Sequence, residues 1–235
     1  MKLKELYEFY ESTLDSNGFY NCLAQKIKDN PGLYNERLLI ESPTTSDVKK
    51  NNLNIIVKKG DSRFDMPLAI GNSSAKERIL ILGLEPRHTD DFFNLMRVGN
   101  KVFATPFGID RWYASSGKRN YYGTAFADFF NTNRVFLFSD FVKEYKVSDP
   151  NDKKQNSEDA RNNFKNLFDH SYKSILEKEI SIFKPALIVG LGKTDILKKV
   201  DKSFLEENSI NVISHPVHGN INRMKLAMHK LLNNE

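Results

Sequence analysis

Titratable side chains follow directly after four short apolar segments of the sequence. They lie in residues 83–88, 139–143, 190–194 and 214–219. Carboxylates, histidines and basic groups are all present, namely Glu85, Asp140, His88, His215, His218, Arg87, Lys143 and Lys193. Carboxylates and imidazoles can move protons and stabilise charge that develops during a reaction. These residues are therefore the first candidates for a functional site.

Four short strands would have to position these side chains. The apolar segments are residues 79–84, 135–139, 186–191 and 211–214. None of them alternates strictly between apolar and polar residues, which indicates strands buried on both faces in a parallel sheet. Helical patterns separate them, so we expect an α/β fold: a three-layer αβα sandwich around a central, mostly parallel four-stranded sheet. Ligands of such sheets bind outside the carboxyl ends of the strands, which is where the titratable residues lie.

The rest of the chain supplies helices and loops. Apolar residues at steps of three and four predict helices over residues 3–14, 20–28, 164–183, 195–200 and 221–232. Residues 53–57 are interpreted as an edge strand, and residues 103–123 and 143–163 as irregular segments. We expect two parts: an N-terminal helical extension, residues 1–77, packed on the core, and an α/β domain, residues 78–235.

Composition limits the classes of protein to which the chain can belong. The 235 residues are 40% hydrophobic and 28% charged, as in a globular domain. Cys22 is the single cysteine, which excludes a disulfide framework and a cysteine-held metal cluster. No apolar run is long enough for a membrane span, and no signal peptide is recognisable. We expect a cytoplasmic monomer that does not bind membranes, and the net charge of +5 slightly favours a polyanionic partner such as DNA.

Several of these segments resemble motifs of the uracil-DNA glycosylase superfamily. Residues 83–88, Gly-Leu-Glu-Pro-Arg-His, resemble the first motif, in which a glycine, a variable residue, a polar catalytic residue and a proline follow a strand. Residues 214–216, Ser-His-Pro, with Arg223 beyond them, resemble the second motif. Residues 184–192 are similar to the family's proline, apolar strand and Leu-Gly segment, and residues 135–143 to its central strand. The resemblance covers the expected α/β domain.

This resemblance implies a hydrolase without metal or cofactor that cleaves the N-glycosidic bond of a deaminated or damaged base, uracil or a related one, flipped out of DNA. Glu85 would stabilise the sugar cation and orient water, and His215 would donate a hydrogen bond to the base O2. Phe107, or else Phe103, would stack on the base. The remaining substrate-binding residues would be Gly83, Leu84, Pro86, Arg87, His88, Asp140 and Ser214. The DNA-binding residues would be Lys193, His218, Asn220 and Arg223.

Three positions depart from the family pattern. Glu85 stands where the main branch has aspartate, and one extra methylene would misplace a water by about 1 Å. Arg87 stands where tyrosine or glycine is frequent. Asp140 stands where asparagine often reads the base edge, and an ionised carboxylate would repel O4 of uracil unless it is protonated.

Other interpretations of the same residues remain open. Glu85 could be a solvated or helix-terminal acid, His215 a turn residue and Asp140 a helix cap. Residues 190–194 resemble only the end of a phosphate-binding loop, because position 187 is leucine where that loop has glycine. His215 and His218 with a carboxylate could bind a metal, but a further strong ligand is not in view. The alternative functions are a family member that binds a base, nucleotide or nucleic acid without cleaving it, and an enzyme acting on free nucleosides or another small molecule.

Overall fold

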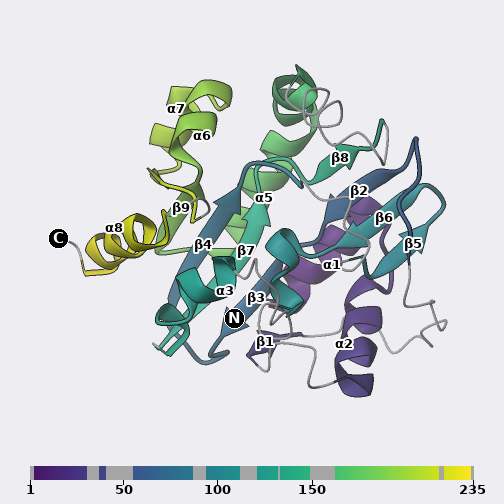
Figure 1. Cartoon of the computed structure of the whole chain (residues 1–235), viewed down its shortest axis with the longest axis horizontal. Coiled ribbons are helices and arrows are strands. Elements are labelled where there is room, and N and C mark those ends of the chain that lie inside the picture. The colour runs from purple at the N-terminus through teal and green to yellow at the C-terminus, as the bar shows by residue number, and fades with distance from the viewer. Residues whose placement is uncertain are drawn as a thin grey trace.

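The computed structural model of the chain describes residues 3–30, 37–40, 55–86, 94–111, 121–131, 133–148, 162–216 and 220–233. Helices and strands form an α/β fold with two sheets (Figure 1). Among the described residues, no helix has the length and apolar character needed to cross a membrane.

The four predicted strands lie next to one another in the larger sheet. They are β7 (Arg134–Asp140), β4 (Glu77–Gly83), β9 (Leu187–Leu191) and β10 (Ile210–Ile213), and each neighbouring pair is parallel. The inner residues of β4 and β7 are buried, as expected for strands covered on both faces. The prediction that four carboxyl ends meet at one edge is confirmed.

The expectation of a four-stranded sheet is wrong, because this sheet has six strands and mixed directions. Its order is β1-β3-β7-β4-β9-β10. Strand β3 (Leu68–Gly71) pairs antiparallel with β7, and β1 (Leu38–Leu39) pairs antiparallel with β3. Both strands are too short to show a periodic pattern of their own, and long-range pairing with β7 is what makes β3 a strand.

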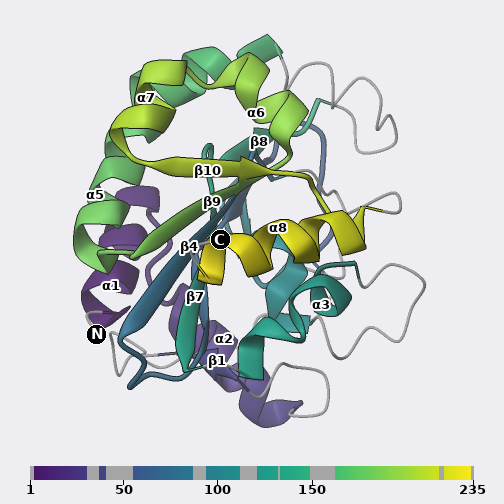
Figure 2. The same cartoon turned by 90° about the vertical axis from the view of Figure 1, so that its left-hand side faces the viewer.

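Helices cover both sides of this sheet. Figure 2 shows α5 (Lys173–Phe183), α6 (Lys193–Lys199) and α7 (Lys202–Glu207) on one side, and α3 (Tyr121–Phe126) and α8 (Ile221–Asn233) on the other. The expected helix 164–183 is helical throughout, from residues 162–167 through a π-helical turn (Phe168–Tyr172) into α5. Helix α7 was not predicted.

A second sheet lies in segments that had no predicted strands. Its order is β5 (Met96–Val98), β6 (Lys101–Ala104), β2 (Ser62–Asp65) and β8 (Glu144–Lys146). Strand β6 overlaps the start of the first segment that was expected to be irregular, residues 103–123. Strand β8 lies near the start of the second, residues 143–163. Residues 129–131 form a short 3-10 helix, η4 (Phe129–Asn131), and the 3-10 segment η3 (Pro106–Arg111) is kinked at Phe107 and Gly108, which have positive φ. Residues 55–57 of the expected edge strand are not in a strand, and residues 53–54 lie outside the described part.

The N-terminal residues belong to the same core as the rest of the chain. Helices α1 (Leu3–Leu14) and α2 (Phe19–Asp29) confirm the predicted helices, and α1 packs beside α5 (Figure 2). The Tyr7 hydroxyl donates to Leu39 O at 2.8 Å and accepts from the Ala69 N–H at 3.1 Å. One cluster of buried side chains includes α1, β3 and the parallel strands. The described part of residues 3–77 therefore contains strands of the sheet as well as helices, and a domain boundary at residue 77 stays a prediction.

Candidate functional site

The site is built on the adjoining ends of β4 and β7. Gly83 and Asp140 are directly opposite each other in the parallel register. Backbone pairing continues beyond both strands, because the Phe141 N–H donates to Gly83 O at 2.9 Å and the Val142 N–H donates to Leu84 O at 3.1 Å. The continued pairing keeps the Asp140 carboxyl next to Gly83. The paired backbone reaches Leu84, the residue before Glu85.

Phe107 lies over Gly83. A Cβ atom added to Gly83 would be 2.7 Å from Phe107 Cζ and would overlap Asp140 Oδ1, so the glycine lets ring and carboxyl approach the backbone. Phe107 has a φ of 59°, an unusual conformation for a bulky residue, which turns its ring towards the strand end. Its ring is half-buried and lies 4.4 Å from the Tyr122 ring, centroid to centroid. The predicted aromatic residue and the predicted base-reading residue are thus side by side.

Tyr122 joins His215 to this group. The Tyr122 hydroxyl and His215 Nε2 are 2.6 Å apart and form a hydrogen bond, and the two rings meet edge to face. His215 follows β10, while Tyr122 lies in α3. A hydrogen bond to one ring nitrogen orients an imidazole. Tyr122 was missed from sequence, although its position in an aromatic segment between two strands was a signal.

Asp140 is a deeply buried carboxyl at the end of β7. Its side chain is 2% exposed, and Oδ2 has no hydrogen-bond partner among the described residues. Burial raises the pKa of Asp140 well above the ordinary value of an aspartate, and the neighbouring charge of Asp65 raises it further. Lys143 lowers the pKa, but burial dominates. The surroundings of Asp140 therefore favour its protonated form.

A buried network fixes the turn that follows Asp140. Lys143 Nζ donates to the Asp140 backbone carbonyl, to Ser139 Oγ at 2.6 Å and to Glu179 Oε2 at 3.1 Å. The Tyr10 hydroxyl donates to the same Glu179 oxygen at 2.7 Å, and burial raises the pKa of Tyr10 so that it stays protonated. Lys143 and Glu179 have no exposed side-chain surface. Residues of α1, of α5 and of the end of β7 therefore hold the turn that follows Asp140 in place.

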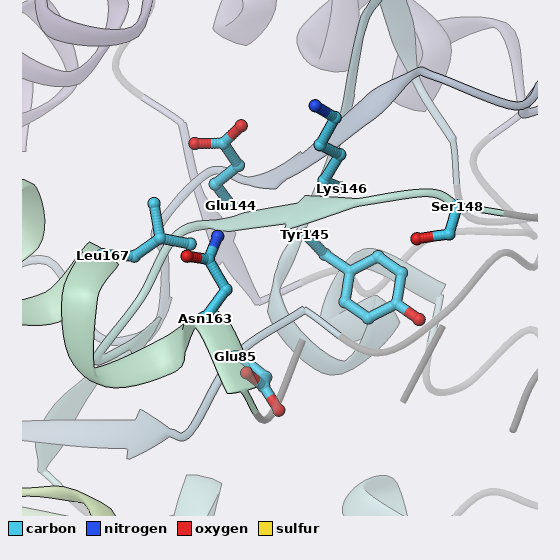
Figure 3. Close-up of a pocket in the computed structure, with 7 residues that line it drawn as sticks. All are labelled: Glu85, Glu144, Tyr145, Lys146, Ser148, Asn163 and Leu167. Carbon is cyan, nitrogen blue, oxygen red and sulfur yellow. The ribbon is translucent and has the colours of Figure 1, made fainter. Parts of the chain in front are cut away.

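Glu85 faces a neighbouring hollow of about 170 Å³. Its lining residues are Glu85, Glu144, Tyr145, Lys146, Ser148, Asn163 and Leu167 (Figure 3). Figure 3 shows Glu144 and Lys146 on one side of β8 and Tyr145 on the other, the side towards Glu85. Lys199 Nζ of α6 is 3.4 Å from Glu85 Oε1, and Glu85 is 9% exposed. The Glu85 carboxylate is thus a largely buried, ion-paired group.

The chain matches no protein-family model and no curated protein sequence. Roles for these residues therefore come from the chemistry and geometry of the site itself.

The structure brings some predicted site residues together and separates others. Gly83, Asp140 and Phe107 form one group, and His215 joins it through Tyr122. Glu85 is close enough for its charge to act on Asp140, but its direct partner is Lys199. The expectation that Glu85 and His215 face each other across one cavity stays a prediction.

The remaining predicted residues lie around this group or outside the described part. Leu84 and Pro86 are buried beside Glu85, and Ser214 is half-buried before His215. The predicted DNA contacts lie at helix starts: Lys193 is exposed in α6, and Asn220 and Arg223 lie at the start of α8. Arg87, His88 and His218 lie outside the described residues. Within the described ranges, no three His, Cys, Asp or Glu residues are arranged to hold a metal ion.

Proposed function

We propose that the protein is a DNA glycosylase-like hydrolase that cleaves the N-glycosidic bond of a deaminated or damaged base, uracil or a related one, flipped out of DNA. The observation that carries the proposal is the placement of the Phe107 ring and the buried Asp140 carboxyl around Gly83, at the carboxyl ends of parallel strands. An aromatic ring beside a buried hydrogen-bonding group is what a flipped heterocycle requires.

The neutral form of Asp140 supports recognition of uracil. A protonated carboxyl offers one donor and one acceptor, as the amide of asparagine does. It can donate to O4 of uracil and accept from N3–H, whereas a carboxylate would repel O4. Burial, which raises the pKa of Asp140, therefore compensates for the aspartate at a position where the family often has asparagine.

Glu85 and His215 would supply the reaction chemistry on either side of the glycosidic bond. Glu85 would stabilise the sugar cation and orient the attacking water, and His215 would stabilise charge on the base O2. The Tyr122–His215 hydrogen bond supports this role because it orients the imidazole. Lys193, Asn220 and Arg223 would contact phosphates of the DNA.

The test is release of free base from oligonucleotides that carry uracil, hypoxanthine or xanthine, single-stranded and double-stranded. We expect release from at least one of them, and a loss of about 100-fold or more in Glu85→Gln. Glu177→Gln changes an exposed glutamate of α5 and should leave release unchanged. Absence of release from every substrate would overturn the proposal.

A second candidate is a protein that binds a flipped base in DNA without cleaving it. The ion pair between Glu85 and Lys199 favours it, because the ammonium group neutralises the carboxylate that should stabilise a sugar cation. This candidate predicts salt-dependent binding of oligonucleotides that is unchanged by Glu85→Gln, with no base released. Faster base release in Lys199→Met would argue against it.

A further inference from the structure

The N-terminal part of the chain contributes charged residues to the proposed base site. Arg63 and Asp65 lie on β2 and are 2% and 4% exposed. The Asp65 N–H donates to Lys143 O at 3.0 Å, only three residues beyond Asp140. The end of β2 therefore packs against the turn that carries Asp140, although some 75 residues separate the two in sequence.

Arg63 favours the ionised form of Asp65. Arg63 Nη2 is 3.5 Å from Asp65 Oδ1, and both side chains are shielded from solvent. An arginine cannot lose its proton in a protein, so its buried charge favours a carboxylate beside it. The position of Arg63 therefore favours the negative charge of the carboxyl pair on Asp65 rather than on Asp140.

Two buried carboxyl groups near each other cannot both ionise without a large cost. Burial is the main cause that raises the pKa of Asp140, and the charge of Asp65 on β2 raises it further; the charges of Glu179 on α5 and of Glu85 beyond β4 add smaller effects. Lys143 opposes them, but its ammonium is already paired with Glu179. The uncharged Phe107 ring lies over the same group. Glu179 and Glu85 each have a basic partner, Lys143 and Lys199, so burial and then the nearby charge of Asp65 have the largest effects on Asp140.

We propose that Asp65 is a positioning residue that sets the base specificity of the site: its buried charge keeps Asp140 in the neutral form, which binds a base edge that presents one donor and one acceptor. The inference rests on the proposed function for its ligand, but not for the state of Asp140. Without the Asp65 charge, Asp140 would ionise more readily and would present two acceptors, which suit an edge with two donors.

The first experiment measures the protonation of Asp140 directly. In protein labelled with ¹³C at the aspartate carboxyl groups, the Asp140 resonance is identified by its loss in Asp140→Asn and followed through a pH titration. We expect the wild-type Asp140 carboxyl to be protonated and Asp65 to be ionised at neutral pH. The inference would be overturned if Asp65 were protonated and Asp140 ionised, or if both were ionised. This result can be obtained even if no Asp65 variant folds.

Variants of Asp65 then test whether its charge is what keeps Asp140 protonated. Asp65→Asn should move the midpoint of the Asp140 titration to lower pH. Asp65→Glu keeps the negative charge, so its midpoint should be close to that of the wild type. Asp201→Asn alters an exposed aspartate, paired with Lys165, and should leave the midpoint in place. An Asp140 midpoint in folded Asp65→Asn equal to that of wild type would contradict the inference.

The second experiment connects this state to the ligand. Binding of an oligonucleotide with uracil should weaken as pH rises through the Asp140 midpoint, and Asp65→Asn should move that weakening to lower pH. If the resonance shifts as expected but no base is bound or released, the proposed function fails and the role of Asp65 stands. If the base is released and its pH profile is unaffected by Asp65→Asn, the role of Asp65 fails alone.

Discussion

A single methyl group at Gly83 should disrupt the proposed base site. In Gly83→Ala, the new Cβ would lie 2.7 Å from Phe107 Cζ and 2.8 Å from Phe107 Cε1, and it would overlap Asp140 Oδ1. Carbon atoms in contact prefer separations of about 3.5–4.0 Å. Phe107 would therefore have to move by about 1 Å, and the buried Asp140 carboxyl would have to move with it.

The size of the effect follows from these contacts. Extra methyl groups in a packed core usually cost about 1–3 kcal/mol. Phe107 is half-buried and can relax in part, so we expect about 1–2 kcal/mol of lost unfolding free energy. The loss of function should be larger, because a displacement of about 1 Å near reacting groups can reduce a rate about 100-fold.

Gly190→Ala is a matched control on the neighbouring strand. Gly190 pairs with Leu82, the residue before Gly83. A Cβ atom there would be 2.9 Å from Ile196 Cδ1, the end of a flexible side chain, and at least 3.6 Å from the other two nearest atoms. This variant should unfold at nearly the wild-type urea concentration and keep its base release and binding.

Urea unfolding and the release or binding of a base from DNA are measured for both variants. The m-value should be unchanged, so that a shift in midpoint reports stability. If Gly83→Ala matches Gly190→Ala in stability and in base release and binding, then Phe107 and Asp140 do not bind a ligand at this place.

Three further predictions concern the charges around the site and the second sheet. Burial raises the pKa of Asp140, so the contribution of the protonated carboxyl to stability is present at low pH and is lost as pH rises through that pKa. The loss should be at most about 1.4 kcal/mol per pH unit. Asp140→Asn should remove this loss in urea unfolding. Arg97→Met should cost about 1.5–3 kcal/mol in the same assay. Burial alone would raise the pKa of Asp61, but hydrogen bonds from Arg97 lower it, so this cost should shrink as pH falls through the Asp61 pKa. Lys143→Met should cost about 3–5 kcal/mol because it leaves Glu179 charged and buried, and the double variant Lys143→Met/Glu179→Gln should unfold at a higher temperature than the single one.

The parallel strands could be found from sequence because each is an uninterrupted apolar segment. Residues 79–83 and 135–138 are buried on both faces, and that is the condition under which a strand loses its alternation. Parallel direction then places the residues after each strand at one edge. Gly83 and Asp140 lie opposite each other for this reason, and Phe107 lies beside them, while its predicted stacking on a base stays a prediction.

The second sheet could not be found in this way. Strands β2, β6 and β8 have three or four residues each, and β2 carries Arg63 and Asp65 inside the protein. Charged residues in a short segment normally indicate an exposed loop. Their burial depends on partners contributed by distant parts of the chain, which a local pattern does not contain.

The sequence by itself determined which segments are apolar strands and which polar residues follow them. It therefore determined that Glu85, Asp140 and His215 lie at the carboxyl ends of one sheet. Only the tertiary structure decided the state of these groups. Glu85 pairs with Lys199, His215 pairs with Tyr122, and burial and the charge of Asp65 raise the pKa of Asp140. The physical reason is that a pKa and a hydrogen bond depend on distance through space, and the partners here are between 75 and 114 residues away along the chain.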